Sequence, residues 1–319
     1  MQTPERQDQH HPVVERLGIV GYGEVGRIFA AGLLARGVNA VAAWDLKFAA
    51  PAQQSEPVAH ARDAGVRAAD NVGGLCSGRQ LIVSAVTASN TLAVAEAVAL
   101  HIAPGTFFLD LNSASPGTKQ HAAQCIEAAG GRYVEAGVMT SVPPYGIAVP
   151  MLLSGPHAQA LAPVLQAWGM DATPVSDELG VASAIKMCRS IMIKGLEALV
   201  IESYATARQY GVEDHVLPTL AETFPSIDWH AQGRYFFSRV VQHGQRRAEE
   251  MRESARTVQE AGMAPLMASA IADKQQWVAN LARTRVFADL PKDALWQDYA
   301  DRLLGSLPPS DTKVSRGSP

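Results

Sequence analysis

The sequence is poor in the features that mark several protein classes. Its three cysteines, Cys76, Cys125 and Cys188, are an odd number set far apart, which disfavours both a disulfide framework and a cysteine metal site. No run of about 18 apolar residues is present, so we expect no membrane contact. The nine histidines show no metal-ligand spacing, and a formal net charge of −4 argues against a nucleic-acid partner. These deficits favour a reduced, cytoplasmic protein without a metal.

The length of the chain predicts two domains, because 319 residues exceed what one hydrophobic core usually fills. Both ends are polar, and we expect disordered extensions over residues 1–13 and 307–319. Between these extensions the pattern changes once, which predicts one domain over residues 14–177 and another over residues 178–306.

The first domain alternates short apolar runs with helical segments. The runs that read as strands are residues 17–20, 40–44, 81–86, 106–111, 132–138, 148–155 and 172–175. Strand and helix alternating at this spacing are typical of crossover units. The pattern therefore predicts an α/β domain with a mainly parallel sheet.

The second domain begins with one long helix. Residues 181–211 contain no proline and no strand-like alternation, and about 30 helical residues would span roughly 45 Å. Apolar residues occupy most sides of this helix, so we expect it to be buried between other helices and, in a homodimer, by a second copy. One polar stripe interrupts it, formed by Ser183, Lys186, Ser190, Lys194 and Glu197. Helical patterns continue to the end, which predicts an all-α domain.

Three glycines follow the first strand, in Gly21-Tyr22-Gly23-Glu24-Val25-Gly26. In this pattern the first glycine permits a tight turn, and the second lets the backbone approach a pyrophosphate. The third lets helix and strand pack closely, while the helix N-terminus favours negative charge. With a strand before it and a helix after it, the motif predicts a dinucleotide site made by Gly21, Tyr22, Gly23, Glu24, Val25 and Gly26.

Polar residues follow three other strands. Asp45 lies 19 residues past Gly26, where an acid can hydrogen-bond the ribose hydroxyls of NAD and repel the 2′-phosphate of NADP. Alternatively, Asp45 is only a solvated acid in a loop. The nearby Lys47 could accept the 2′-phosphate of NADP, so NADP stays possible as the cofactor. Thr87, Asn112 and Ser113 stand at the carboxyl edge of later strands, where they could touch the nicotinamide or its ribose. Capping of the next helix explains them equally well.

The glycine motif and the stretch ELGVASAIKMCRS, residues 178–190, resemble the β-hydroxyacid dehydrogenases. This is the family of 3-hydroxyisobutyrate and 6-phosphogluconate dehydrogenases, and the resemblance runs from Leu17 to about Leu304. It implies a Rossmann-type domain followed by an all-α domain, with NAD or NADP as cofactor. Gly180 and Lys186 are in register with the family's helix motif, which implies that Lys186 is the catalytic lysine.

The segments that resemble the family's substrate pocket depart from its pattern. Met139, Thr140 and Ser141 replace a Ser-Gly-Gly that grips the substrate carboxylate, and Ser190 is one of two residues that replace paired asparagines. Near the family's K-D-L helix start the lysine is lost. Arg246 and Arg247 lie just before that place and could clamp a carboxylate, although we expect one of them to pair with nearby glutamates. The departures predict a distinct subgroup with its own substrate.

The expected reaction is hydride transfer between the nicotinamide and a small hydroxy acid or related alcohol. Lys186 could take the hydroxyl proton, because burial on an apolar helix favours the neutral amine. Ser190, one turn further, could hydrogen-bond the lysine or the substrate, or bond back to its own helix. A lysine whose amine reaches water is the alternative for Lys186. Two other functions stay open: an imine reductase of the same architecture, and a non-catalytic nucleotide-binding scaffold.

Overall fold

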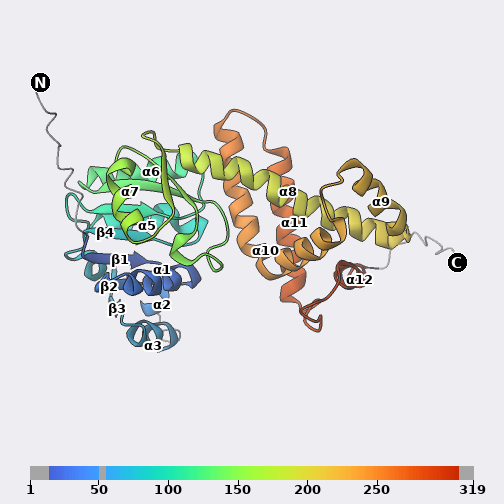
Figure 1. The fold of residues 1–319 in the computed structure, drawn as a ribbon, viewed down its shortest axis with the longest axis horizontal. Helices are drawn as coiled ribbons and strands as arrows, with labels where there is room; N and C mark the ends of the chain where they lie inside the picture. The colour runs from blue at the N-terminus through green and yellow to red at the C-terminus, as the bar shows by residue number, and fades with distance from the viewer. Residues whose placement is uncertain (1–13, 50–54, 309–319) are drawn as a thin grey trace, which may run out of the picture. The chain divides into compact units, whose positions relative to one another are not determined.

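A computed structural model gives the fold, and it describes residues 14–49 and 55–308 (Figure 1). The predicted extension over 1–13 lies outside these residues, as does all of 307–319 except its first two positions. The chain forms two compact units, one ending at Met187 and the other beginning at Cys188. This boundary falls inside a helix, ten residues after the boundary suggested by the sequence pattern, because the first turns of that helix are held by the first unit.

The first unit is built on one eight-stranded sheet. Its strands are β1 (Arg16–Val20), β2 (Ala40–Trp44), β3 (Arg67–Ala68), β4 (Leu81–Ser84), β5 (Phe107–Asp110), β6 (Arg132–Val138), β7 (Met151–Ser154) and β8 (Ala172–Ser176). They are ordered β3-β2-β1-β4-β5-β6-β7-β8, and every neighbouring pair is parallel except β6 with β7. The order from β3 to β6 is that of doubly wound dinucleotide-binding domains, which confirms the predicted α/β fold.

Helices connect these strands. They are α1 (Glu24–Ala35), α2 (Leu46–Ala49), α3 (Ser55–Asp63), α4 (Val72–Cys76), α5 (Thr91–Ala99), α6 (Pro116–Ala128) and α7 (Ala158–Ala167), with 3₁₀ turns η1 (Ala88–Asn90) and η2 (Gly146–Ala148). Strand β3 and helices α2 to α4 were not predicted. Strand β3 and helices α2 and α4 are too short for a hydrophobic period to stand out, and α3, with the sequence SEPVAHARD, has few apolar residues to form one.

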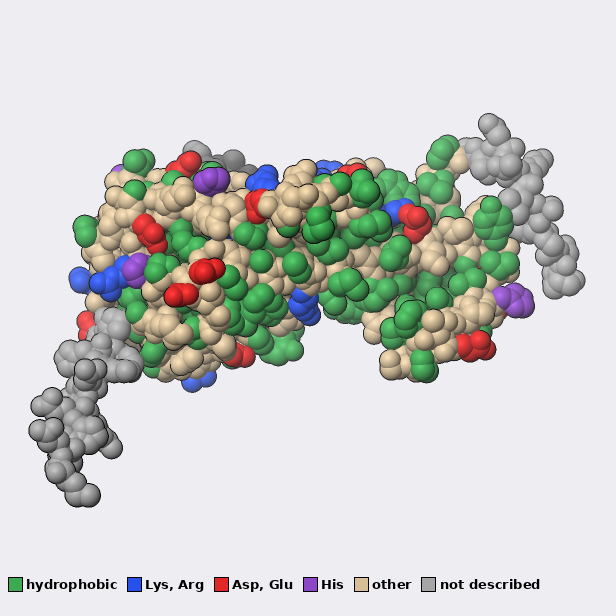
Figure 2. All heavy atoms as spheres, turned by 90° about the horizontal axis from the view of Figure 1, so that it is seen from above, with side chains coloured by type: hydrophobic (Ala, Val, Ile, Leu, Met, Phe, Trp, Pro, Cys, Tyr) green, Lys and Arg blue, Asp and Glu red, His purple; other side chains and the backbone are tan. Residues whose placement is uncertain are grey.

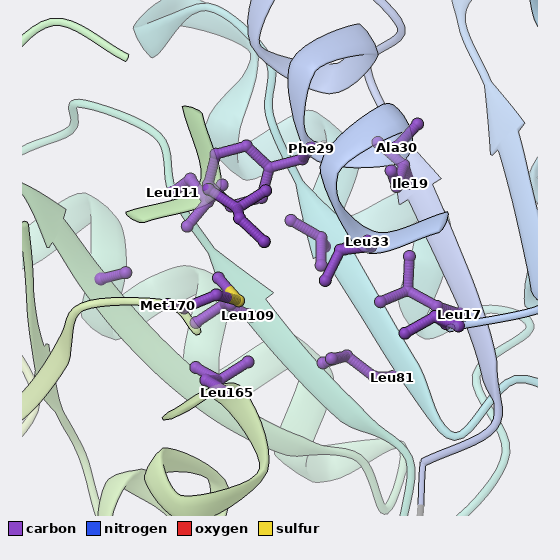
Figure 3. Close-up of a cluster of buried hydrophobic side chains, with 14 of the residues drawn as sticks. Leu17, Ile19, Phe29, Ala30, Leu33, Leu81, Leu109, Leu111, Leu165 and Met170 are labelled. Carbon is purple, nitrogen blue, oxygen red and sulfur yellow. The ribbon is translucent and has the colours of Figure 1, made fainter. Parts of the chain in front are cut away.

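Apolar side chains cover both faces of the sheet. One core packs β1, β4 and β5 against α1 and α7, and Figure 3 shows it. Labelled members of this core are Leu17, Ile19, Phe29, Ala30, Leu33, Leu81, Leu109, Leu111, Leu165 and Met170. Alternate residues of the same strands, such as Val20 and Ile82, belong to a second core on the other face. Strands buried on both faces read as continuous apolar runs, as the sequence does here.

The second unit contains helices only, among the residues described. After α8 (Val181–Tyr210), which begins in the first unit, come α9 (Glu213–Thr223), α10 (Trp229–Glu260), α11 (Leu266–Arg283) and α12 (Trp296–Gly305). The all-α prediction is confirmed, and the long helix ends one residue before the predicted position. None of the helices in the described ranges has the length and apolar character needed to cross a membrane.

Helix α8 differs from expectation in which sides it buries. Its polar stripe is turned inward: Ser190, Lys194 and Glu197 are each at most 8% exposed. By contrast, Met192 and Leu199 are 74% and 56% exposed. The expectation that its apolar sides are all covered is therefore wrong for a single chain, because polar partners on other helices occupy the buried side.

Candidate active site

The loops after four neighbouring strands form the edge where the predicted cofactor residues gather. Strand β2 pairs with β1, β1 with β4, and β4 with β5, and all three pairings are parallel. The carboxyl ends of these strands therefore meet at one edge of the sheet. The predicted residues that follow them lie in this order along the edge: Asp45, Gly21, Thr87 and Asn112.

The three glycines have three different geometries, and each fits its role in a dinucleotide motif. Gly21 has a φ of +92°, and a Cβ built there would lie 2.5 Å from the oxygen of Ala85. A Cβ on Gly26 would lie 2.0 Å from the oxygen of Gly21, so α1 can pack against β1 only without a side chain at that position. A Cβ on Gly23 would meet nothing within 4 Å. The open space beside Gly23, at the N-terminus of α1, fits a pyrophosphate.

The other motif residues offer backbone groups rather than side chains. Tyr22 is 2% exposed, and its hydroxyl lies 3.2 Å from Nδ1 of His60. Glu24 is exposed and opens α1, while Val25 is half-buried and packs against the core. That these three residues contact a cofactor stays a prediction, and we expect the contact to involve their main-chain groups.

Asp45 ties the end of β2 to the glycine loop. Its Oδ2 accepts the N–H of Tyr22 at 2.8 Å, and its Oδ1 accepts the N–H of Lys47 at 2.9 Å. Each carboxylate oxygen can accept a further hydrogen bond, and the side chain is half-buried, so Asp45 retains capacity for ribose hydroxyls.

Asn112 and Thr87 both hold neighbouring loops. The Oδ1 of Asn112 accepts the N–H of Val86 at 2.7 Å, and its Nδ2 donates to Ser84 Oγ at 2.9 Å. Thr87 Oγ1 accepts from Asn90 Nδ2 at 2.8 Å, at the start of η1. These bonds are structural, but they are not the helix caps that the sequence left open, because Ser115 caps α6 and the side chain of Thr87 caps no backbone amide of η1. Contact of either residue with the cofactor stays a prediction.

Lys186 reaches the same edge from α8. Its Nζ donates a hydrogen bond of 2.6 Å to the Oγ of Ser113, which lies just past the end of β5. Lys186 is half-buried, and both residues belong to the first unit. An amine and a hydroxyl therefore meet at the edge of the sheet that also carries the glycine loop.

A buried charge network supports the backbone that leads to Ser113. Lys119 Nζ donates to the main-chain oxygen of Asp110 at 2.9 Å and lies 3.0 Å from its Oδ1. Tyr133 donates its hydroxyl to Asp110 Oδ2 at 2.6 Å, and the N–H of Asn112 donates to Oδ1 at 2.9 Å. Burial, reinforced by the charge of Asp110, raises the pKa of Tyr133 well above its usual range, so its hydroxyl remains a donor.

Three buried charges in this region, Asp110, Lys119 and Glu135, were absent from the predicted site. Glu135 is fully buried and binds the start of α8. Lys119 shares one face of α6 with Ala122 and Ile126, both buried, so helical spacing could have placed it inside. Glu135 could have been predicted to be buried, because it is an acid in the middle of a largely apolar strand.

The segment predicted to replace the family's substrate loop connects β6 to β7. The N–H of Met139 donates to the oxygen of Pro150 at 2.9 Å. Met139 and Ser141 are half-buried and Thr140 is exposed. Because β6 is parallel to β5, this loop leaves the sheet at the same carboxyl edge as Ser113. Contact with a substrate stays a prediction for all three residues.

The remaining predicted substrate residues lie in the second unit. Ser190 Oγ accepts from Lys194 Nζ at 3.2 Å. Arg247 lies 3.1 Å from Glu197 Oε2, and the residue is 8% exposed. Arg246 makes only a 3.9 Å contact with Glu250, and its side chain is 46% exposed. In the described parts of the chain, no group of three or more His, Cys, Asp or Glu residues could hold a metal ion.

The chain matches known proteins over most of its length. Residues 16–176 match the model for the NAD binding domain of 6-phosphogluconate dehydrogenase, and residues 207–278 match a domain of unknown function (DUF1932). The chain belongs to the β-hydroxyacid dehydrogenase family. A conserved hypothetical protein from Sinorhizobium meliloti 1021 is 36% identical, with 93% of this chain and 98% of that chain covered and a TM-score of 0.74.

More distant structures share the fold. One is 3-hydroxyisobutyrate dehydrogenase from Mycobacterium tuberculosis with L-serine, which is 16% identical to this protein. The match covers 91% of this chain and 99% of that chain, with a TM-score of 0.68. Another is a reductive aminase from Aspergillus terreus with NADPH and ethyl levulinate, which is 17% identical. That match covers 92% of this chain and 100% of that chain, with a TM-score of 0.54. The family assignment confirms the predicted NAD(P) cofactor and makes this protein a nicotinamide-dependent oxidoreductase.

Proposed function

We propose that this β-hydroxyacid dehydrogenase transfers a hydride between NAD and a small hydroxy acid or related alcohol, with Lys186 as general acid and base. The observation that best supports this role is the 2.6 Å hydrogen bond from Lys186 Nζ to Ser113 Oγ. It brings an amine to the carboxyl edge of β5, the same edge that carries the glycine loop.

The proposed cofactor placement follows the order of the strands. Gly21, Gly23 and Gly26 would hold the pyrophosphate at the end of β1, and Asp45 would hold the adenine ribose at the end of β2. The nicotinamide would then extend toward β4 and β5, where Ser113 and Lys186 meet. The charge of Asp45 would repel a 2′-phosphate, which supports NAD over NADP. When bound, the nicotinamide supplies the hydride acceptor or donor.

Lys186 would handle the proton that accompanies the hydride. During oxidation its neutral amine takes the proton of the substrate hydroxyl, and during reduction its ammonium returns that proton and stabilises negative charge on the oxygen. Ser113 accepts the lysine's hydrogen bond and so restricts where the amine points. The reaction needs such a group near the substrate oxygen, and the described residues offer Lys186 at this edge.

The substrate we propose carries a carboxylate. Thr140 and Ser141 offer hydroxyl donors where the family has two glycines, and Met139 puts an apolar side chain in place of the family's serine. Of the two arginines, Arg246 has the more exposed guanidinium, whereas Arg247 is buried against Glu197. Arg246 is therefore the better candidate for binding a carboxylate.

An imine reductase is the second candidate, because a reductive aminase shares the fold. Lys186 favours the hydroxy acid, since enzymes of the imine-reducing type commonly lack a lysine at this helix position. A scaffold that binds the cofactor without catalysis is the third candidate, and it would leave the Lys186–Ser113 contact without a role.

A substrate screen tests the proposal. Hydroxy acids including 3-hydroxyisobutyrate, polyol acids and cyclic imines would be tested with NAD and NADP, and turnover followed at the nicotinamide absorbance band. We expect turnover of at least one hydroxy acid, with NAD preferred. Turnover restricted to imines would favour the second candidate, and NAD binding without any turnover would favour the scaffold.

A homodimer is also part of the proposal. Hydrophobic side chains gather on the surface of the helical unit seen in Figure 2. Met192 and Leu199 on α8 are exposed, and so are Leu266 and Met267 at the start of α11, at 77% and 59%. Apolar surface of this kind is typical of an interface with another chain. The cytoplasmic location stays a prediction.

A further inference from the structure

Two buried acids lie side by side in the first unit, and each holds one side of the Lys186–Ser113 contact. Asp110 on β5 and Glu135 on β6 are partners in the parallel register, and both are 0% exposed. Asp110 binds the backbone that leads to Ser113. Glu135 instead binds the start of α8, the helix that carries Lys186.

The start of α8 receives its hydrogen-bond acceptors from the sheet. The N–H of Gly180 donates to Glu135 Oε2 at 2.6 Å, and the N–H of Ser183 donates to Glu135 Oε1. The N–H of Ala182 donates to Ser154 Oγ at 3.1 Å. The first amides of a helix have no partner within the helix, so these side chains satisfy groups that would otherwise be buried without one.

The carboxylate of Glu135 lies close to the start of α8 and interacts with its backbone amides. Glu135 has no ion-pair partner among the residues described, so the amides and the positive end of the helix dipole balance its charge. A Cβ on Gly137, two residues along β6, would lie 2.8 Å from the oxygen of Ala182. Strand and helix therefore touch, and the turn before α8 depends on Gly180, whose φ is +102°.

We propose that Glu135 is a positioning residue for Lys186: its buried carboxylate fixes the first turn of α8 and so sets the amine against Ser113. The inference rests on the proposed role of Lys186 in catalysis. Lys186 lies six residues after Gly180, within two helical turns of the carboxylate. A proton-transfer group must be held to about 0.5 Å, and a frayed first turn would not hold it that closely.

Glu135→Gln is the main test, because the amide keeps the size of the side chain but turns one acceptor oxygen into a donor. One of the two helix amides then loses its partner. The reactivity of the Lys186 amine would be measured without any substrate, by trace labelling with acetic anhydride and peptide mass spectrometry. We expect labelling of Lys186 to rise about threefold or more, while exposed Lys47 is unchanged. Amide hydrogen exchange at Gly180 and Ser183 should rise with it.

Two variants separate positioning from general destabilisation. Glu135→Asp retains the charge and both oxygens, so it should give a smaller rise at Lys186 than Gln does, and it keeps the test readable if the Gln variant does not fold. Asn71→Ala removes an analogous cap, the 2.8 Å bond from the N–H of Gly74 at the start of α4, and should leave Lys186 labelling unchanged.

Faster exchange at Gly180 without faster labelling of Lys186 would overturn the inference, as would an equal labelling rise in Asn71→Ala. The proposed function is tested separately by replacing Lys186 itself. A Lys186→Met enzyme with full activity would remove that function and leave the positioning result standing.

Discussion

The two units of this protein bury charge in different ways. In the first unit, Asp110 and Glu135 accept hydrogen bonds from backbone amides and from neighbouring side chains, next to the loops of the proposed site. In the second, Arg247 pairs with Glu197, and Lys194 with Glu250, between α8 and α10. Buried charge thus shapes a site in the first unit and joins helices in the second.

The buried Arg247–Glu197 pair of the second unit does not fully offset the cost of burying its two charges. Burial raises the pKa of Glu197 and lowers the pKa of Arg247, in each case against the influence of the partner. Arg247 Nε and Gln275 Oε1 are buried with no hydrogen-bond partner among the residues described. Pairing therefore recovers only part of the desolvation energy, whereas the carboxylate of Glu135 in the first unit has an amide donor on each oxygen.

The largest effect we predict is in the glycine loop, where two similar substitutions should separate folding from function. Gly26→Val puts a side chain against the oxygen of Gly21 and should cost on the order of 5 kcal/mol or prevent the first unit from folding. Gly23→Val points into open space, so it should leave the melting temperature nearly unchanged but abolish NAD binding. Thermal unfolding and titration calorimetry measure both. Unchanged NAD affinity in Gly23→Val would mean that the loop is not the cofactor site.

The ion pair of the second unit should show the next largest effect. Glu197→Leu or Arg247→Met alone leaves a buried charge without its partner and should cost about 3–5 kcal/mol of unfolding free energy. The double variant should cost much less than the sum, because two apolar side chains avoid the desolvation. Urea unfolding of the three variants measures this. A double variant as unstable as the two single losses combined would show no energetic coupling between Glu197 and Arg247, and would contradict this account of the pair.

The sequence predicted the parts of both units whose signals are local. The strand runs, the glycine loop and the long helix each show in a short stretch of residues, and all are present. The buried acids were harder, because Glu135 is explained only by the amides of α8, distant in the chain. The sequence also could not show which side of α8 is buried. It shows the polar stripe, but Glu197 is buried because Arg247 on α10 pairs with it, and that partner is far away in the chain.

Cofactor choice should change by a smaller amount. Asp45→Ser removes the charge that repels a 2′-phosphate and a charged acceptor for the ribose, so the ratio of kcat/KM for NAD over NADP should fall about tenfold or more. The loss of the bond to the N–H of Tyr22 is shared by both cofactors and does not enter the ratio. A wild-type enzyme that prefers NADP would contradict the assignment of Asp45.

The most direct test of the central claim is the rate of hydride transfer in Lys186→Met, measured with the best hydroxy acid and saturating NAD. The substitution removes the amine and its hydrogen bond to Ser113 but preserves apolar bulk. General acid–base groups contribute about 10²–10⁴-fold, so kcat should fall at least about a hundredfold, with little change in NAD affinity. Lys186→Arg should not restore it, because guanidinium stays protonated. A Lys186→Met enzyme that retains kcat within a few-fold of wild type would contradict the account.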